Sequence, residues 1–213
     1  MEFLQMKVED RIALITINKA PANALSSAVL KELSLLMDDL ENQEEVRVVL
    51  LHGEGRFFSA GADIKEFTTV ETGEEFAELA KFGQDLFERM ENFPKPIIAA
   101  IHGAALGGGL ELAMGCHIRL VTKTAKLGLP ELQLGLIPGF AGTQRLPKLV
   151  GSAKAFEMLF TSDTLTGEEA VQWGLANKAV DEEVLMDEAL KMAKKIAQKG
   201  PISVASVIEL SRF

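Results

Sequence analysis

The stretch PIIAAIHGAALGGGLE, residues 96–111, decides how this chain is organised. Its apolar part, residues 97–101, is typical of a buried strand that a His-Gly pair ends. Three consecutive glycines, residues 107–109, then lead into a helix predicted over residues 108–115. A helix that begins directly after a strand and a glycine turn presents unpaired backbone N–H groups at one point. The stretch therefore predicts a place that binds negative charge, and Glu111 follows it closely.

Strands and helices alternate over the first part of the chain. Apolar runs predict buried strands over residues 3–8, 11–17, 46–52, 97–101 and 118–122, and a short extended segment over 125–129. Apolar residues at helical spacing predict helices after Ser26 or Ser27 and over residues 74–92, 108–115, 142–150, 151–160, 166–174, 184–198 and from 201 onward. This order indicates an α/β fold with crossover connections and a helical C-terminal part. We expect any linker near residues 177–182.

Composition narrows the classes of protein. The chain has 213 residues, 47% of them hydrophobic and 25% charged, which is enough for a sizeable core. A formal net charge of −9 without a basic block disfavours nucleic acid as a partner. The single cysteine excludes an intrachain disulfide and favours a reducing compartment. Neither a signal peptide nor an apolar run near the roughly 20 residues that span a bilayer is present, so we expect a cytoplasmic protein without membrane attachment.

Several common site patterns are missing from the sequence. His52, His102 and His117 are not at metal-ligand spacing, and Cys116 has no second thiol nearby, so we predict no metal site and structural histidines. The Gly-x-Ser-x-Gly serine motif, the phosphate loop and the dinucleotide fingerprint are also absent.

What remains is two backbone turns and two carboxylates. Residues 59–63 and 106–109 both offer N–H groups that no large side chain covers, and two such donors on one carbonyl oxygen form an oxyanion hole. Glu111 and Glu131 both have apolar, Gly-, Pro- or Leu-rich neighbours, where burial raises a carboxyl pKa and suits it to general acid or base catalysis.

Each of these features also has a structural interpretation. The glycines are equally typical of a helix packed closely on a strand. Glu111 also fits a first-turn carboxylate that the helix dipole stabilises, and Glu131 also fits the partner of an arginine. The residues alone leave these alternatives open.

Three ordered motifs resemble those of the enoyl-CoA hydratase/isomerase (crotonase) superfamily, and enoyl-CoA hydratase most closely. They are FSAGADIK at residues 58–65, IHGAALGGGLELA at 101–113 and LGLPELQLGLIPGFAGTQRL at 127–146, and the resemblance extends from about Val8 to the end. It implies a spiral of repeated ββα units with a helical C-terminal region, assembled as homotrimers or dimers of trimers. It also implies a core over residues 1–180 and, over 181–213, the start of a helical region that appears incomplete, because family members usually continue with further helices.

The resemblance assigns roles to individual residues. The N–H groups of Ala62 and Gly108 are implied to form the oxyanion hole for a thioester carbonyl. Glu111 and Glu131 match the two carboxylates that hydratases place on either side of a water molecule. The residues implied to line the coenzyme A site are Ala60, Ala62, Asp63, Ile64, Lys65 and Gly108, with backbone groups near Ala60 and Ile64 contacting the adenine.

The implied reaction is that of a hydro-lyase of fatty-acid β-oxidation or branched-chain acyl degradation. It adds water to a trans-2-enoyl-CoA and gives a 3-hydroxyacyl-CoA, with Glu111 as the base and Glu131 as the acid. Coenzyme A is part of the substrate, and no separate cofactor is implied. Alternatives are an enoyl-CoA isomerase, a methylglutaconyl-CoA-type hydratase and a non-catalytic RNA-binding relative. Net charge and the intact glutamate pair weigh against the last.

Overall fold

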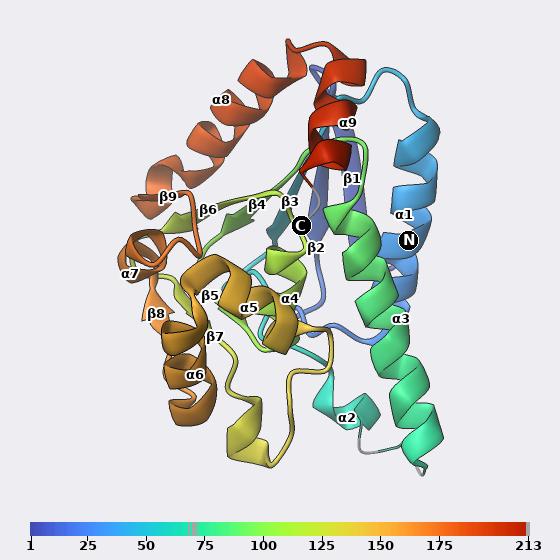
Figure 1. Ribbon diagram of the computed structural model, residues 1–213. Helices are drawn as coiled ribbons and strands as arrows, with labels where there is room; N and C mark the ends of the chain where they lie inside the picture. Colours follow the sequence, from blue (N-terminus) through green and yellow to red (C-terminus); the bar gives the residue numbers. More distant parts are fainter. Residues whose placement is uncertain (68, 70–71, 212–213) are drawn as a thin grey trace.

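A six-stranded sheet forms the centre of the fold in the computed structural model of the chain, which describes residues 1–67, 69 and 72–211 (Figure 1). In the order in which they pair, its strands are β1 (Leu4–Glu9), β2 (Ile12–Ile17), β3 (Val48–Gly53), β4 (Ile97–Ile101), β6 (Ile118–Thr122) and β9 (Lys178–Val180). The β1–β2 pair is antiparallel and all other pairs are parallel. Parallel neighbours require crossover connections, which the predicted alternation of strands and helices supplies.

A second, three-stranded sheet lies beside the first. It contains β5 (Ala104–Leu106), β7 (Lys126–Gly128) and β8 (Leu165–Thr166). The chain passes repeatedly from one sheet to the other, because β4 is followed by β5 and β6 by β7. The β4–β5 pair then leads into the helix α4 (Gly108–Met114). This alternation is the ββα repeat that the sequence predicts.

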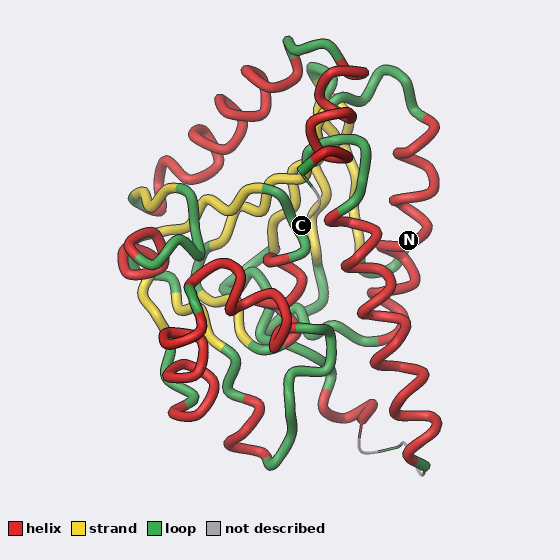
Figure 2. The backbone as a smooth tube through the Cα atoms, in the orientation of Figure 1, coloured by secondary structure: helices red, strands yellow, loops and turns green. Residues whose placement is uncertain are grey.

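Helices surround the two sheets (Figure 2). They are α1 (Ser27–Asn42), α2 (Ile64–Phe67), α3 (Gly73–Glu91), α5 (Gly142–Val150), α6 (Ser152–Thr161), α7 (Gly167–Gln172), α8 (Leu185–Ala197) and α9 (Pro201–Leu210), with the 3₁₀ helices η1 (Glu131–Leu134) and η2 (Glu182–Val184). At the start of α7, Thr166 and Glu169 form the capping box that the sequence predicts. None of the helices in the described part of the chain is long and apolar enough to cross a membrane.

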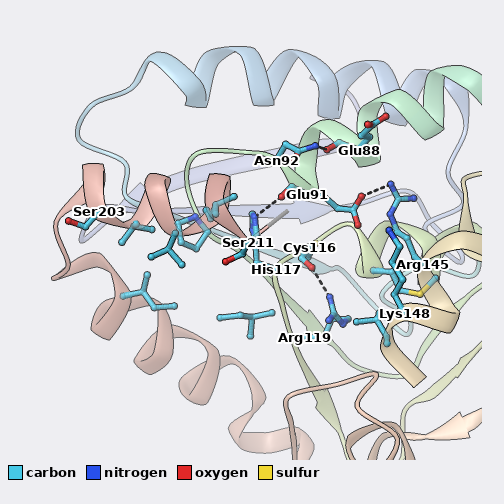
Figure 3. Close-up of a pocket in the computed structure, with 18 residues that line it drawn as sticks. Glu88, Glu91, Asn92, Cys116, His117, Arg119, Arg145, Lys148, Ser203 and Ser211 are labelled. Atoms are coloured by element: carbon cyan, nitrogen blue, oxygen red, sulfur yellow. Dashed lines mark hydrogen bonds and ion pairs between the residues drawn. The ribbon is translucent and has the colours of Figure 1, made fainter. Parts of the chain in front are cut away.

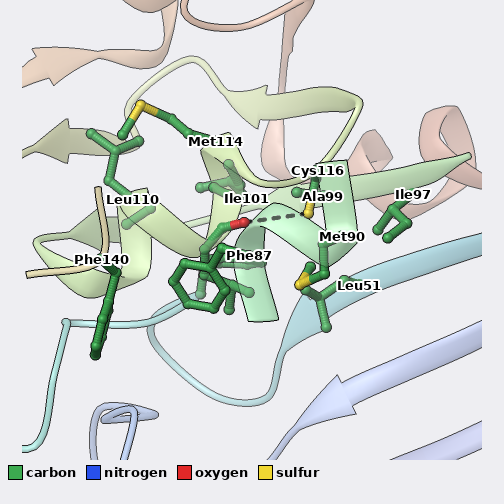
Figure 4. Close-up of a cluster of buried hydrophobic side chains, with 14 of the residues drawn as sticks. Leu51, Phe87, Met90, Ile97, Ala99, Ile101, Leu110, Met114, Cys116 and Phe140 are labelled. Carbon is green, nitrogen blue, oxygen red and sulfur yellow. Dashed lines mark hydrogen bonds between the residues drawn. The ribbon is translucent and has the colours of Figure 1, made fainter. Parts of the chain in front are cut away.

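The central strands of the main sheet are buried on both faces, whereas β1 at its edge is mostly exposed. Along β4, Ile98 and Ala100 belong to the cluster that α8 covers, whereas Ile97, Ala99 and Ile101 belong to the cluster on the other face. That second cluster contains side chains of α1, α3 and α4, and Figure 4 shows part of it around Phe87 and Phe140. Burial on both faces explains why these strands are continuous apolar runs in the sequence.

The expected linker at residues 177–182 is wrong. Lys178–Val180 forms β9, which pairs in parallel with β6 and extends the main sheet at its edge. A strand this short shows no periodicity in the sequence, so only its pairing with β6 identifies it. In the region expected to be helical from residue 181, the described residues form η2, α8 and α9, and residues 212–213 lie outside the described part.

Gly109 sets how closely α4 approaches the chain that follows β3. A methyl group at Gly109 would lie 2.3 Å from the carbonyl oxygen of Ser59, a contact with backbone that cannot easily move. We therefore expect Gly109→Ala to lower the free energy of unfolding by about 2 kcal/mol or more, measured by urea denaturation. Gly73→Ala is the control, since a methyl there meets no described atom within 4 Å. Equal stability of the two variants would contradict this packing.

Candidate active site

The glycine turn between β5 and α4 leaves one backbone N–H without a partner. Gly107 has a positive φ of 52°, and its N–H donates to the carbonyl of Gly128 at 2.9 Å. Gly108 is the first residue of α4, where an N–H group has no acceptor within the helix. Within the described residues the Gly108 N–H donates no hydrogen bond. It is therefore available to a ligand.

The N–H of Ala62 borders the same small space. Leu25 bridges this segment on both sides, because its N–H donates to the Gly61 carbonyl at 2.8 Å and its carbonyl accepts from Asp63 at 3.1 Å. The N–H of Ala62 between them has no acceptor among the described residues. A methyl group at Gly108 would lie 3.1 Å from the Ala62 nitrogen, so the two amides are close neighbours. The structure thus brings the two predicted donors together.

Glu111 is a buried carboxylate on the first turn of α4. Its side chain is 1% exposed, and Oε1 accepts hydrogen bonds from the backbone N–H groups of Phe140 at 2.9 Å and Gly142 at 2.8 Å. Burial, and then the charge of Glu131, raise the pKa of Glu111 to about 7, against the opposing effect of the two amides and of Arg145. The group is therefore poised to gain or lose a proton near neutral pH.

Glu131, at the start of η1, lies against the same glycine turn. A methyl group at Gly107 would be 2.9 Å from Glu131 Oε1, so only glycine leaves room for this carboxyl group. Its Oε2 is buried without a hydrogen-bond partner among the described residues, and burial raises the pKa of Glu131. The alternative that Glu131 pairs with an arginine is wrong for the described part of the chain, where its carboxylate forms no ion pair.

The loop proposed to meet coenzyme A is held in place by polar contacts. Lys19 Nζ bonds Asp63 Oδ2 at 2.8 Å, and this hydrogen bond lowers the pKa of Asp63. The N–H of Ala60 donates to the Ala22 carbonyl at 2.9 Å. Ile64 is 53% exposed, and Lys65 is exposed beside it.

Sequence reasoning missed Asn23, which fixes this loop. The side chain is buried, and its Nδ2 donates to the carbonyls of Glu54 at 2.9 Å and Phe57 at 2.8 Å. The backbone of Asn23 has a φ of 53°, a conformation that asparagine tolerates better than most residues. An asparagine between small residues in a loop was the available signal.

Phe140 and Arg145 were also missed. The Phe140 ring packs edge-on against Phe87 with centroids 5.4 Å apart, in space that Gly83 leaves open. Arg145 is only 7% exposed although it lies on a helix. Polar residues precede Arg145 in α5 and Lys148 follows it, so the local sequence gave no sign that this side chain is buried.

The residues set aside as structural have internal partners. His52 Nε2 lies 2.9 Å from Thr16 Oγ1, and His102 Nε2 lies 2.8 Å from the Gly55 carbonyl. His117 accepts from the N–H of Ile97 at 3.0 Å. Cys116 is buried, and burial raises its thiol pKa to about 12, so the thiol is not a nucleophile at neutral pH.

A hollow of about 1300 Å³ lies apart from the carboxylate pair (Figure 3). Its lining comes from the end of α3, the start of β6, and helices α5, α8 and α9, and includes Glu91, His117 and Arg145 but neither Glu111 nor Glu131. Size alone would suggest this hollow as the site. The converging amides and the pKa-shifted carboxyl groups point to the glycine turn instead.

Two amides without a partner among the described residues thus lie beside two carboxyl groups, one buried and one half-buried, on a two-sheet ββα scaffold. The comparison with known families agrees, because the model of the enoyl-CoA hydratase/isomerase family matches residues 7–211. A probable enoyl-CoA hydratase of Bacillus subtilis (strain 168) is 56% identical over 99% of this chain and 82% of its own length. The short-chain-enoyl-CoA hydratase of Clostridium acetobutylicum is 44% identical over 93% of this chain and 77% of its own.

A solved structure shows the same fold. The crystal structure of an enoyl-CoA hydratase from Bacillus anthracis superposes with a TM-score of 0.93 at 37% identity, over 97% of this chain and 81% of that one. The chain therefore belongs to the enoyl-CoA hydratase/isomerase family. The predicted crotonase-like α/β fold is confirmed.

The raised pKa of Glu111 makes a prediction for stability. The folded protein holds this proton up to about pH 7, whereas an unfolded glutamate releases it near its ordinary value of 4.5. The free energy of unfolding therefore falls as pH rises from about 4.5 to 7, because Glu111 resists ionisation only in the folded state. A neutral glutamine avoids this cost and keeps an oxygen that can accept from Phe140 and Gly142.

We expect Glu111→Gln to gain about 2 kcal/mol relative to the wild type between pH 5 and pH 8. Urea denaturation at both pH values measures it. Glu74→Gln, at an exposed position on α3, is the control and should show no such trend. A constant difference between Glu111→Gln and wild type across this range would contradict the raised pKa.

Proposed function

We propose that the chain is an enoyl-CoA hydratase, which adds water to a trans-2-enoyl-CoA thioester and gives a 3-hydroxyacyl-CoA. One observation carries the proposal: the buried carboxyl group of Glu111 and the half-buried one of Glu131 lie beside two unpaired N–H groups, that of Gly108 in the glycine turn and that of Ala62 next to it. An isomerase needs to move a proton only within its substrate, whereas hydration needs one group for water and another for carbon. The names of the relatives described above support the same reaction.

The two amides would stabilise the charge that the reaction develops. Attack of water at C3 of the conjugated thioester pushes electrons onto the thioester oxygen. The N–H groups of Ala62 and Gly108 would donate to that oxygen, and such preorganised donors contribute several kcal/mol in a site that excludes water. These donors need no rearrangement, because the bridge to Leu25 and the start of α4 hold them in place.

The two carboxyl groups would divide the proton transfers. Glu111 accepts two amide hydrogen bonds, which favour its ionised form, so it would take a proton from water as the hydroxyl group bonds to C3. Glu131 has a buried oxygen without a donor, which favours its neutral form, and it would give its proton to C2. Mutual repulsion of the two charges keeps about one proton on the pair near neutral pH. The sum is one water added across the double bond.

The binding of the coenzyme A part would fall to the loop from Ala60 to Lys65. Its fixed conformation, through the Lys19–Asp63 ion pair and the Asn23 side chain, would let backbone groups contact the adenine. Coenzyme A would enter as part of the substrate, and the proposed steps use no separate cofactor. We place the reaction in fatty-acid degradation and expect a homotrimer or a dimer of trimers.

The direct experiment is to mix the purified protein with crotonyl-CoA. We expect the absorbance of the conjugated enoyl thioester to fall and the product to gain the mass of one water. A folded protein without turnover would exclude hydration of this short substrate, and longer enoyl thioesters would extend the test. Conversion of a 3-enoyl-CoA without gain of water would instead favour the isomerase.

Removing either carboxyl group should slow the reaction strongly. We expect Glu111→Gln and Glu131→Gln each to lower kcat by about 100-fold or more, because positioned acid–base groups contribute this much. Glu74→Gln is a matched control on the surface of α3 and should keep the wild-type rate. A near-normal rate in either site variant would remove that residue from the mechanism.

The rate should also depend on pH in a defined direction. Below about pH 7, Glu111 becomes protonated and can no longer accept a proton from water. We therefore expect kcat/KM to decline about tenfold per pH unit on the acidic side of this value. A profile that stays flat from pH 7 down to pH 5 would show that Glu111 is not the base.

A further inference from the structure

Arg145 connects two parts of the structure from a buried position on α5. Its Nη1 donates to the carbonyl of Phe140 at 2.8 Å, and its Nη2 bonds Glu91 Oε2 on α3 at 2.9 Å. Figure 3 shows the guanidinium group reaching Glu91 at the wall of the hollow. The Phe140 carbonyl is thus held by a buried, charged donor, which forms a strong hydrogen bond.

The peptide segment from Phe140 to Gly142 is bonded on two sides. The carbonyl of Phe140 accepts from Arg145, while the N–H groups of Phe140 and Gly142 donate to Glu111. Between them, Ala141 has a φ of 69°, an uncommon conformation for a residue with a side chain. Such a turn is stable only where its surroundings determine it. The Arg145 bond supplies one of these constraints.

We propose that Arg145 is a positioning residue for Glu111: by holding the Phe140 carbonyl, it fixes the two N–H groups that orient the Glu111 carboxylate. The contacts described above support this positioning role directly. Its effect on catalysis rests on the proposed hydratase function.

The charges around Glu111 also support a role for Arg145. Glu131 on η1 disfavours the ionised form of Glu111, whereas Arg145 on α5 favours it and keeps the pKa of Glu111 from rising further. Glu91 on α3 pairs with Arg145 from the outer side, with its side chain 42% exposed. Among the described groups that act on Glu111, Arg145 is the only cation, and it counteracts the effect of Glu131. A neutral residue at position 145 removes this positive charge.

The competing explanation is that Arg145 serves only to tie α5 to α3. Glu91→Gln separates the two roles, because it removes the ion pair with α3 and leaves the bond to Phe140. The glutamine oxygen can still accept a hydrogen bond from Arg145 Nη2, so the buried guanidinium group keeps a partner and this variant should fold. Arg145→Gln removes both bonds and the charge, and Arg145→Lys keeps the charge but not the fork of donors.

The first measurement needs no substrate. Protein labelled with ¹³C at the glutamate carboxyl groups gives the pKa of Glu111 by NMR titration, with Glu111→Gln assigning the signal. We expect Arg145→Gln to raise this pKa, because the variant removes a positive charge that favours the ionised form of Glu111 and loosens the two N–H groups that bind it. Glu91→Gln should leave it within a few tenths of a unit.

The second measurement is the kinetics of hydration. We expect Arg145→Gln to lower kcat about 10- to 100-fold with little change in KM, and to move the acidic limb of the pH profile upward with the pKa. Arg145→Lys should keep the limb in place but still lower kcat, because the Phe140 carbonyl loses its fixed donor. Glu91→Gln should stay within about threefold of the wild-type kcat.

The outcomes separate this inference from the proposed function. Folded Arg145→Gln with an unchanged pKa of Glu111 overturns the positioning role, whatever the activity. If Arg145→Gln does not fold, Arg145→Lys decides, and a wild-type kcat in that variant overturns the role. A shifted pKa in a protein that does not hydrate crotonyl-CoA supports positioning and counts against the hydratase.

Discussion

Two backbone N–H groups, those of Phe140 and Gly142, donate to a carboxylate on α4 that is about thirty residues away in sequence. A buried carboxylate without such donors is too costly to keep, so the segment before α5 must lie where it does for Glu111 to be buried at all. That requirement explains the surrounding details. The Phe140 ring inserts next to Gly83, and Ala141 takes up a left-handed conformation.

The glycines, which carry no side chain, shape the site as much as the carboxylates do. Gly107 leaves room for Glu131, Gly108 for the neighbouring Ala62 amide, and Gly109 for the Ser59 carbonyl. The consecutive glycines therefore serve three different neighbours. The run allows close packing of the helix, and the same packing brings the two amides together.

The sequence predicted the long elements and the motif residues, and it failed where distant parts of the chain meet. Periodicity identifies β4 and α8 because each shows several turns or alternations of its pattern. β9 is too short for that and depends on pairing with β6. The four residues that the sequence predicts at the centre of the site lie together in the structure. They could be predicted because the three ordered motifs contain them. Asn23 and Arg145 act through bonds to distant carbonyls, such as those of Phe57 and Phe140, which no local pattern encodes.

The proposed anion-binding half of the site is built from main chain alone. Every substitution at Ala62 or Gly108 except proline keeps the backbone N–H, so other substitutions can disturb this half only by adding bulk. The carboxyl groups are different, because a single codon change removes either one. In the proposed site, binding of the thioester oxygen would therefore be the durable part of the scaffold, and the proton-transfer groups would be its exchangeable part. A lineage built on this scaffold can change its reaction one carboxylate at a time while it continues to bind the same kind of substrate.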